Sequence, residues 1–119
     1  MKFLFYKSNK KINDWTMSKE RLEQLMNFLN DGSTDPFIRY AIATEYVKLK
    51  QYDLALKYYQ DLLFKNPDYI GTYYHAGKLL ELLNRREEAV SIYEKGMEIA
   101  KKIKNMHAFS ELQGVYRMA

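Results

Sequence analysis

The feature of this sequence that most constrains its fold is a repeat with a period of 34 residues. When the chain is shifted along itself by that distance, identical or closely similar side chains coincide. The pairs are Tyr40 with Tyr74, Ala43 with Gly77, Leu49 with Leu83, Ala55 with Ala89, and Tyr59 with Tyr93. One unit of this length cannot bury its own apolar face, whereas stacked neighbours bury a continuous core. The sequence therefore predicts similar units stacked on one another.

The units are expected to be pairs of helices. Apolar residues recur at helical spacing, and β-branched residues never form the alternating runs of strands. Asp35-Pro36 is a strong helix start and Asn66-Pro67 a strong stop. The expected segments are a leading helix at 18–30, a first helix pair at 36–67, a second pair at 70–101 and a capping helix at 106–117. The predicted fold class is all-α.

Individual residues mark several helix ends. Ser18 is expected to cap the leading helix, and Gly32 to end it in the left-handed conformation. Asp53 is expected to cap the second helix of the first pair. Glu87 and Glu88 at one helix start fit the macrodipole, because a helix N-terminus carries partial positive charge.

Small residues mark the seam between paired helices. Two helices approach closely only where their side chains are small, and large side chains then fill the spaces beside the crossing. The small seam residues are Ala43, Ala55, Gly77 and Ala89, and the large ones are Tyr46, Tyr59, Leu80 and Tyr93. Pro67 closes the first unit.

This arrangement resembles the tetratricopeptide repeat, whose pattern is W-x2-L-G-x2-Y, then A-x3-F, then P. The matching residues are Arg39, Ile42, Ala43, Tyr46, Ala55, Tyr59 and Pro67, then Tyr73, Ala76, Gly77, Leu80, Ala89 and Tyr93. Arg39 departs from the aromatic preference, and Lys101 replaces the second closing proline. The resemblance covers residues 36–101 and implies a right-handed α-solenoid of antiparallel helix pairs, with the flanking helices as caps.

The resemblance also implies a binding groove. Tyr40 and Tyr74 lie on the side of each first helix that faces away from the seam, and in this family that side lines a concave groove for a peptide or partner helix. Carried onto this sequence, the groove comprises Phe37, Tyr40, Thr44, Lys48, Tyr74, His75 and Lys78. The alternative is that Phe37, Tyr40 and Tyr74 are covered internally by the leading helix or by residues 1–16.

The predicted function is a non-catalytic protein–protein interaction module, an adaptor that binds a peptide or partner protein. Some relatives hold an acidic chaperone tail with a lysine-and-asparagine clamp, but Tyr40 and Thr44 stand where that clamp needs those residues. The alternative function is self-association, in which the same faces pair with a second copy as a homo-oligomer. The sequence does not name the partner.

Catalytic and metal chemistry have little support in the sequence. The chain has no cysteine, and its two histidines, His75 and His107, have no metal-like partner at helical spacing. No glycine-rich loop could cradle a phosphate. We therefore expect no enzyme activity, no cofactor and no metal.

The net charge of +4 belongs mainly to residues 1–16, which hold four lysines and one aspartate. The other basic residues lie in separate places, so specific nucleic-acid binding is not expected. No apolar run is long enough for a membrane span, and we expect a cytoplasmic protein. Two interpretations of residues 1–16, here called the leader, stay open. The leader is a non-native or disordered extension, or Phe3, Phe5, Tyr6 and Trp15 fold back over the leading helix.

Overall fold

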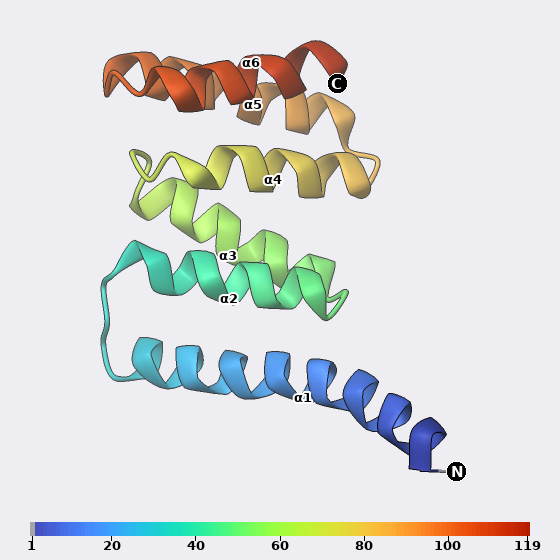
Figure 1. Cartoon of the computed structure of the whole chain (residues 1–119). Coiled ribbons are helices and arrows are strands. Elements are labelled where there is room, and N and C mark those ends of the chain that lie inside the picture. The colour runs from blue at the N-terminus through green and yellow to red at the C-terminus, as the bar shows by residue number, and fades with distance from the viewer. Residues whose placement is uncertain (1) are drawn as a thin grey trace. The chain divides into compact units, whose positions relative to one another are not determined.

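The computed structural model describes the backbone of residues 2–119 and the side chains of residues 15–119, and within that part the chain forms helices and no strand (Figure 1). The helices are α1 (Lys2–Asn30), α2 (Pro36–Lys48), α3 (Tyr52–Lys65), α4 (Gly71–Leu82), α5 (Arg86–Lys102) and α6 (Met106–Met118). They divide into two compact units, residues 1–55 and 56–119, and the boundary falls within α3. The predicted all-α fold is confirmed.

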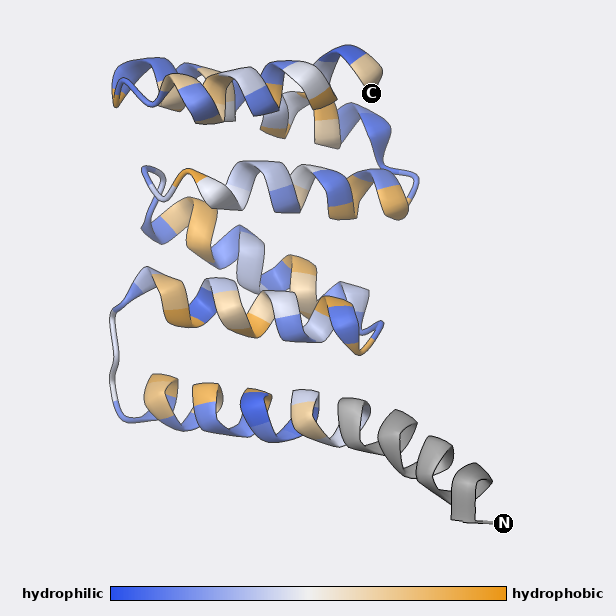
Figure 2. Cartoon of the chain, in the orientation of Figure 1, coloured by the Kyte–Doolittle hydropathy of each residue, from blue (hydrophilic) through white to orange (hydrophobic). Residues whose placement is uncertain are grey.

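Helix starts follow from local chemistry. The side chain of Asp35 accepts a hydrogen bond from the backbone N–H of Phe37 at 3.0 Å, and Pro36 occupies the first turn of α2. Asn105 caps α6 in the same way, through a 3.0 Å bond from the N–H of Ala108. Hydrophobic and hydrophilic positions occur together in each described helix, which is typical of helices that bury one face (Figure 2).

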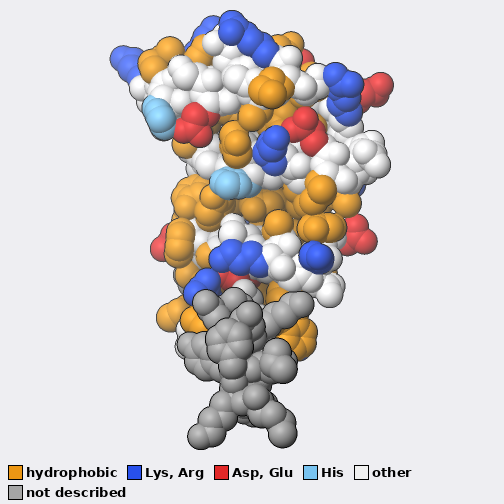
Figure 3. Space-filling view, turned by 45° about the vertical axis from the view of Figure 1, so that its right-hand side comes forward, with side chains coloured by type: hydrophobic (Ala, Val, Ile, Leu, Met, Phe, Trp, Pro, Cys, Tyr) orange, Lys and Arg blue, Asp and Glu red, His pale blue; other side chains and the backbone are white. Residues whose placement is uncertain are grey.

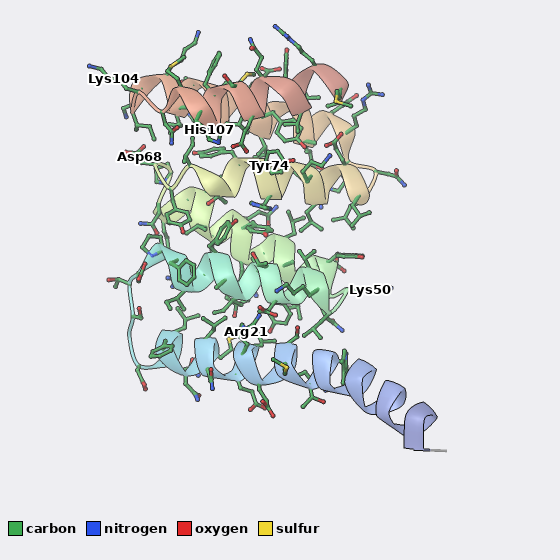
Figure 4. The ribbon with its side chains drawn as sticks, viewed as in Figure 1. Arg21, Lys50, Asp68, Tyr74, Lys104 and His107 are labelled. Atoms are coloured by element: carbon green, nitrogen blue, oxygen red, sulfur yellow. The ribbon has the colours of Figure 1, made fainter. Side chains whose placement is uncertain are left out.

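Four helix ends share one geometry, with a residue of positive φ just beyond the helix. These residues are Gly32, Lys50, Asn84 and Lys104, with φ of 94°, 59°, 59° and 60°. After α4, for example, the N–H of Asn84 bonds to the carbonyl of Glu81 at 3.0 Å, and the next N–H bonds to Leu80 at 2.8 Å. This is the Schellman pattern, which satisfies the last carbonyls of a helix. Figure 4 shows Lys50 and Lys104 at two of these ends.

Two helix starts differ from the expectation. The leading helix, expected over 18–30, begins at Lys2, so Ser18 lies inside α1 and does not cap it. The physical reason is that residues 2–30 contain no proline or glycine to interrupt a helix. Asp53 lies in the first turn of α3, where its charge suits the helix dipole, instead of at the cap. The prediction for the leader falls mostly on side chains outside the described residues.

The first unit is held together by α1 against α2. Leu25 of α1 is 8% exposed, and Ile42 and Ala43 of α2 are fully buried. Burial of these aliphatic side chains supplies the hydrophobic contact between the two helices. In Figure 1, α1 runs beside α2.

The second unit packs α4, α5 and α6 together at two glycines. The ring of Tyr93 lies directly against Gly77, and Tyr73 and Leu112 lie against Gly96.

Among the predicted seam residues, those buried are Ala43, Ala55, Tyr59, Gly77, Leu80, Ala89 and Tyr93. Tyr46 is half-buried, and Pro67 is exposed because it lies in the turn after α3.

Candidate interaction site

The groove residues expected in the first unit form a row along α2. Phe37 is 52% exposed, Tyr40 and Thr44 are half-buried, and Lys48 is exposed. Their spacing of three or four residues places them on one side of the helix. The hydroxyl of Thr44 donates to the carbonyl of Tyr40 at 3.0 Å, so this side chain is engaged by its own helix. The apolar ring of Phe37 is an open part of the row.

A buried carboxylate lies between α1 and α2. Glu45 has a side chain only 4% exposed, and its Oε1 lies 2.9 Å from Nη1 of Arg21 and 3.4 Å from Nζ of Lys48. Burial alone would raise the pKa of Glu45, but the hydrogen bond from Arg21 and the charge of Lys48 outweigh it and lower the pKa. Figure 4 shows Arg21 on α1 beside α2. Lys48, expected in the groove, therefore already has a partner.

The groove residues expected in the second unit include one that lines a pocket. Tyr74 on α4 faces a pocket of about 190 Å³ whose other wall comes from the start of α6. The lining includes Ile70, Gly71, Tyr74, His107, Ala108 and Glu111. Figure 4 shows Tyr74 and His107 on these two helices. The sequence pointed to Tyr74 but not to the α6 wall, because α6 lacks the repeat pattern.

Polar groups surround this pocket. His107 Nε2 lies 2.5 Å from Oε1 of Glu111, one turn later on α6, so the expectation that His107 has no such partner at helical spacing was wrong. The ring of His75 stands edge-on to Tyr74, with centroids 5.3 Å apart. Burial lowers the pKa of His75, and the nearby charge of Glu111 partly opposes that shift. Figure 3 shows both histidines of the chain on one face, with acidic and hydrophobic side chains near them.

Lys78, the last groove residue expected, is joined to the core of the second unit. Its Nζ lies 3.7 Å from Oε2 of Glu81, and the same oxygen accepts a 2.5 Å hydrogen bond from the hydroxyl of Tyr93. Burial and this hydrogen bond raise the pKa of Tyr93 far above its usual range. Lys78 therefore has a local acidic partner, as Lys48 does.

A second, larger pocket lies between α5 and α6. Its volume is about 470 Å³ and its lining residues are Glu94, Met97, Glu98, Lys101, Phe109 and Tyr116. Nζ of Lys101 lies 5.1 Å from the centre of the Phe109 ring, which is a cation–π geometry. The sequence analysis did not single out this pocket, since its residues come from two helices with no shared motif.

The described residues carry no sign of a metal site or a membrane span. Within the side chains from residue 15 onward, no three His, Asp or Glu residues gather as a group that could hold a metal ion. In the described part of the chain, no helix is long and apolar enough to cross a membrane.

A family model described as "Tetratricopeptide repeat" matches residues 38–63 and 70–103, which together are half of the chain. These ranges overlap the two predicted helix pairs, 36–67 and 70–101.

Solved structures agree with this match. A tetratricopeptide repeat domain protein from Salinibacter ruber is 41% identical, with a TM-score of 0.70, over 71% of this chain and 86% of that chain. A protein from Bordetella parapertussis is 26% identical, with a TM-score of 0.71, over 82% of this chain and 84% of that one.

One curated relative is the uncharacterized protein ycf37 of Cyanophora paradoxa, 38% identical over 45 residues. The match spans 38% of this chain and 26% of the relative's length.

Tetratricopeptide repeats generally mediate protein–protein interactions, and proteins built from them are generally non-catalytic scaffolds. From the repeat spacing, the packing at the seam and these matches, it follows that the chain belongs to the tetratricopeptide repeat family.

Proposed function

We propose that this chain is a non-catalytic adaptor that binds a peptide or a segment of a partner protein along the first helices of its repeats. In the first unit the binding surface would be the row on α2, and in the second unit it would be Tyr74 with His75 and Lys78. We also propose a cytoplasmic location, because a cysteine-free chain suits a reducing compartment.

The observation that carries the proposal is the pocket beside Tyr74. A half-buried tyrosine at the wall of a concave, partly apolar site offers contact area at low entropic cost, and its hydroxyl can bond to a partner's backbone. Ile70, Ala108 and Leu112 add apolar wall, so one aliphatic or aromatic side chain of the partner would fit there.

The two lysines of the proposed groove already have acidic partners, and this restricts the chemistry of the segment that could bind. Lys48 lies against the buried Glu45, and Lys78 lies against Glu81. A carboxylate partner would have to compete with these acidic side chains for either lysine. We therefore propose a partner segment bound through apolar and aromatic side chains and not through an acidic tail.

A selection from a random peptide library on the immobilised 119-residue chain tests the proposal. We expect recovered peptides to share an apolar or aromatic anchor, and Tyr74→Ala to weaken their binding at least tenfold by fluorescence anisotropy. Phe64→Ala is the matched control, since Phe64 is an aromatic residue that is 87% exposed and lies outside the pocket. Tyr40→Ala tests the α2 row in the same assay.

Two outcomes would contradict the proposal. Peptides that bind Tyr74→Ala and Tyr40→Ala as tightly as the unchanged chain would be using another surface. A selection that returns no reproducible sequence would leave the Tyr74 pocket without a peptide ligand. Self-association is a second candidate function, favoured by the open α5–α6 pocket.

A further inference from the structure

The α5–α6 pocket lies on the last helices that the structure describes. Here Met97 and Phe109 are half-buried, and Tyr116 is 37% exposed, around an open volume of about 470 Å³. The volume of this pocket lies within the range of known binding sites.

The charge around this pocket favours a basic partner. Its lining has two carboxylates, Glu94 and Glu98, and one cation, Lys101. Lys101 is held over the ring of Phe109, and Glu98 lies 3.7 Å from Lys95 on the same helix. Among the described residues Glu94 has no ion-pair partner. A basic segment with an apolar side chain would complement the site.

The first unit presents a surface of that kind. Trp15 precedes Leu22 by seven residues, so the two lie on one side of α1. Near the end of α2, Glu45 contacts Arg21, and α2 stops at Lys48. Because α2 ends so soon after the contact between Glu45 and Arg21, it leaves Trp15 55% exposed.

Trp15 lies beside a basic side chain. The ammonium group of Lys19 lies 3.9 Å from the centre of the indole ring. In the sequence Trp15 also follows four lysines of the leader, which has a single aspartate. An aromatic side chain with one lysine over its ring, in a stretch of sequence with an excess of lysine, complements a pocket whose lining has two carboxylates and one ammonium group.

We propose that the α5–α6 pocket of one molecule binds the Trp15 end of α1 of a second copy, so that chains associate head to tail. The two surfaces are different, so an open assembly keeps one free pocket at one end and one free Trp15 end at the other. Such heterologous contacts close into rings or extend into filaments. This interface does not use the Tyr74 pocket, so it can fail or succeed independently of the proposed peptide groove.

Trp15 is the chain's single tryptophan, and it therefore reports its own burial. As the concentration of the full chain rises, we expect its fluorescence emission to move to shorter wavelength while sedimentation equilibrium shows a mass above that of the monomer. Raised salt should weaken the association, because charge attraction contributes. A constant emission maximum together with a monomer mass at every concentration would overturn the proposal.

Two variants each disable one surface. Trp15→Ala removes the indole. Glu94→Lys with Glu98→Lys reverses the charge of the two carboxylates that line the pocket. Because both positions are exposed, these two substitutions should not affect folding. Each should weaken self-association at least tenfold. Phe64→Ala should leave it unchanged, and circular dichroism verifies that all variants are folded.

Mixing the two defective variants tests whether the pocket of one molecule contacts the Trp15 end of another. The Trp15→Ala chain keeps an intact pocket, and the charge-reversed chain keeps an intact Trp15, so a one-to-one mixture should form dimers with a blue-shifted indole. Self-association of the unchanged chain without such dimers in the mixture would place the contact on other surfaces and overturn the head-to-tail arrangement.

Discussion

The ring of Tyr93 on α5 occupies the space in which a side chain at Gly77 on α4 would lie. A Cβ built on Gly77 would lie 2.6 Å from Cζ of Tyr93 and 2.7 Å from Cδ1, closer than carbon atoms can pack. Tyr93 is fully buried and its hydroxyl bonds to Glu81, so the ring cannot easily move aside. The residue pair fixes the distance between α4 and α5.

Gly77→Ala is therefore expected to destabilise the protein. Overpacking of a buried site typically costs about 1–3 kcal/mol, and the gain in helix propensity from alanine, about 1 kcal/mol, offsets part of it. Urea unfolding followed by circular dichroism measures the effect. Gly114→Ala is the matched control, because a Cβ there meets nothing within 4 Å, and it should stabilise α6 by about 0.5–1 kcal/mol. Equal effects at both glycines would contradict the packing argument.

Acid should destabilise the contact between α1 and α2. The pKa of Glu45 is lowered from its ordinary value of 4.5, so the stabilisation is complete above that pH and is lost as pH falls through the folded-state pKa. We expect Glu45→Gln to lower the free energy of unfolding by about 1–3 kcal/mol at pH 7. It should also flatten the decline of stability below pH 4.5, as measured by thermal melts across that range.

The arginine partner supplies a control for this prediction. Arg21→Gln removes the 2.9 Å contact but leaves Lys48 beside the carboxylate, so it should have part of the effect of Glu45→Gln. If the unchanged chain and Glu45→Gln lost stability in parallel as pH falls, Glu45 would not be the group responsible.

Lys104→Gly should stabilise the protein. Lys104 has a φ of 60°, a left-handed conformation that costs a residue with a Cβ about 1 kcal/mol relative to glycine. The gain should appear as a higher midpoint of urea unfolding. Asn84→Gly at φ 59° should give a smaller gain, because asparagine tolerates this conformation better than lysine. A larger gain at Asn84 than at Lys104 would contradict this explanation.

The basic leader should account for any binding of polyanions. Replacing Lys2, Lys7, Lys10 and Lys11 with glutamine in the full chain should remove most retention on a heparin column at low salt, because residues 17–119 are close to neutral. Replacing Lys50, Lys57, Lys65 and Lys104 instead removes the same charge and should have a smaller effect. Equal loss in the two variants would show that net charge alone governs retention.

Much of the fold could be predicted from local patterns. Asp35-Pro36 starts α2 as expected, because capping and proline chemistry depend on adjacent residues. The predicted start at Ser18 was wrong. A capping residue marks the start of a helix only where the residues before it resist helix formation, and here they do not. The α6 wall of the Tyr74 pocket could not be predicted, because no repeat match aligns α6 with α4.

The sequence by itself determined the helix pairs, the repeat period and the family, because all three follow from the spacing of small and large side chains along the chain. Only the tertiary structure decided that Glu45 is a buried ion-pair partner of Arg21, 24 positions earlier in the sequence. It also brought Tyr74 together with His107, and Met97 with Phe109, into pockets. These relationships depend on how whole helices pack, and packing joins residues whose separation in the sequence carries no local signal.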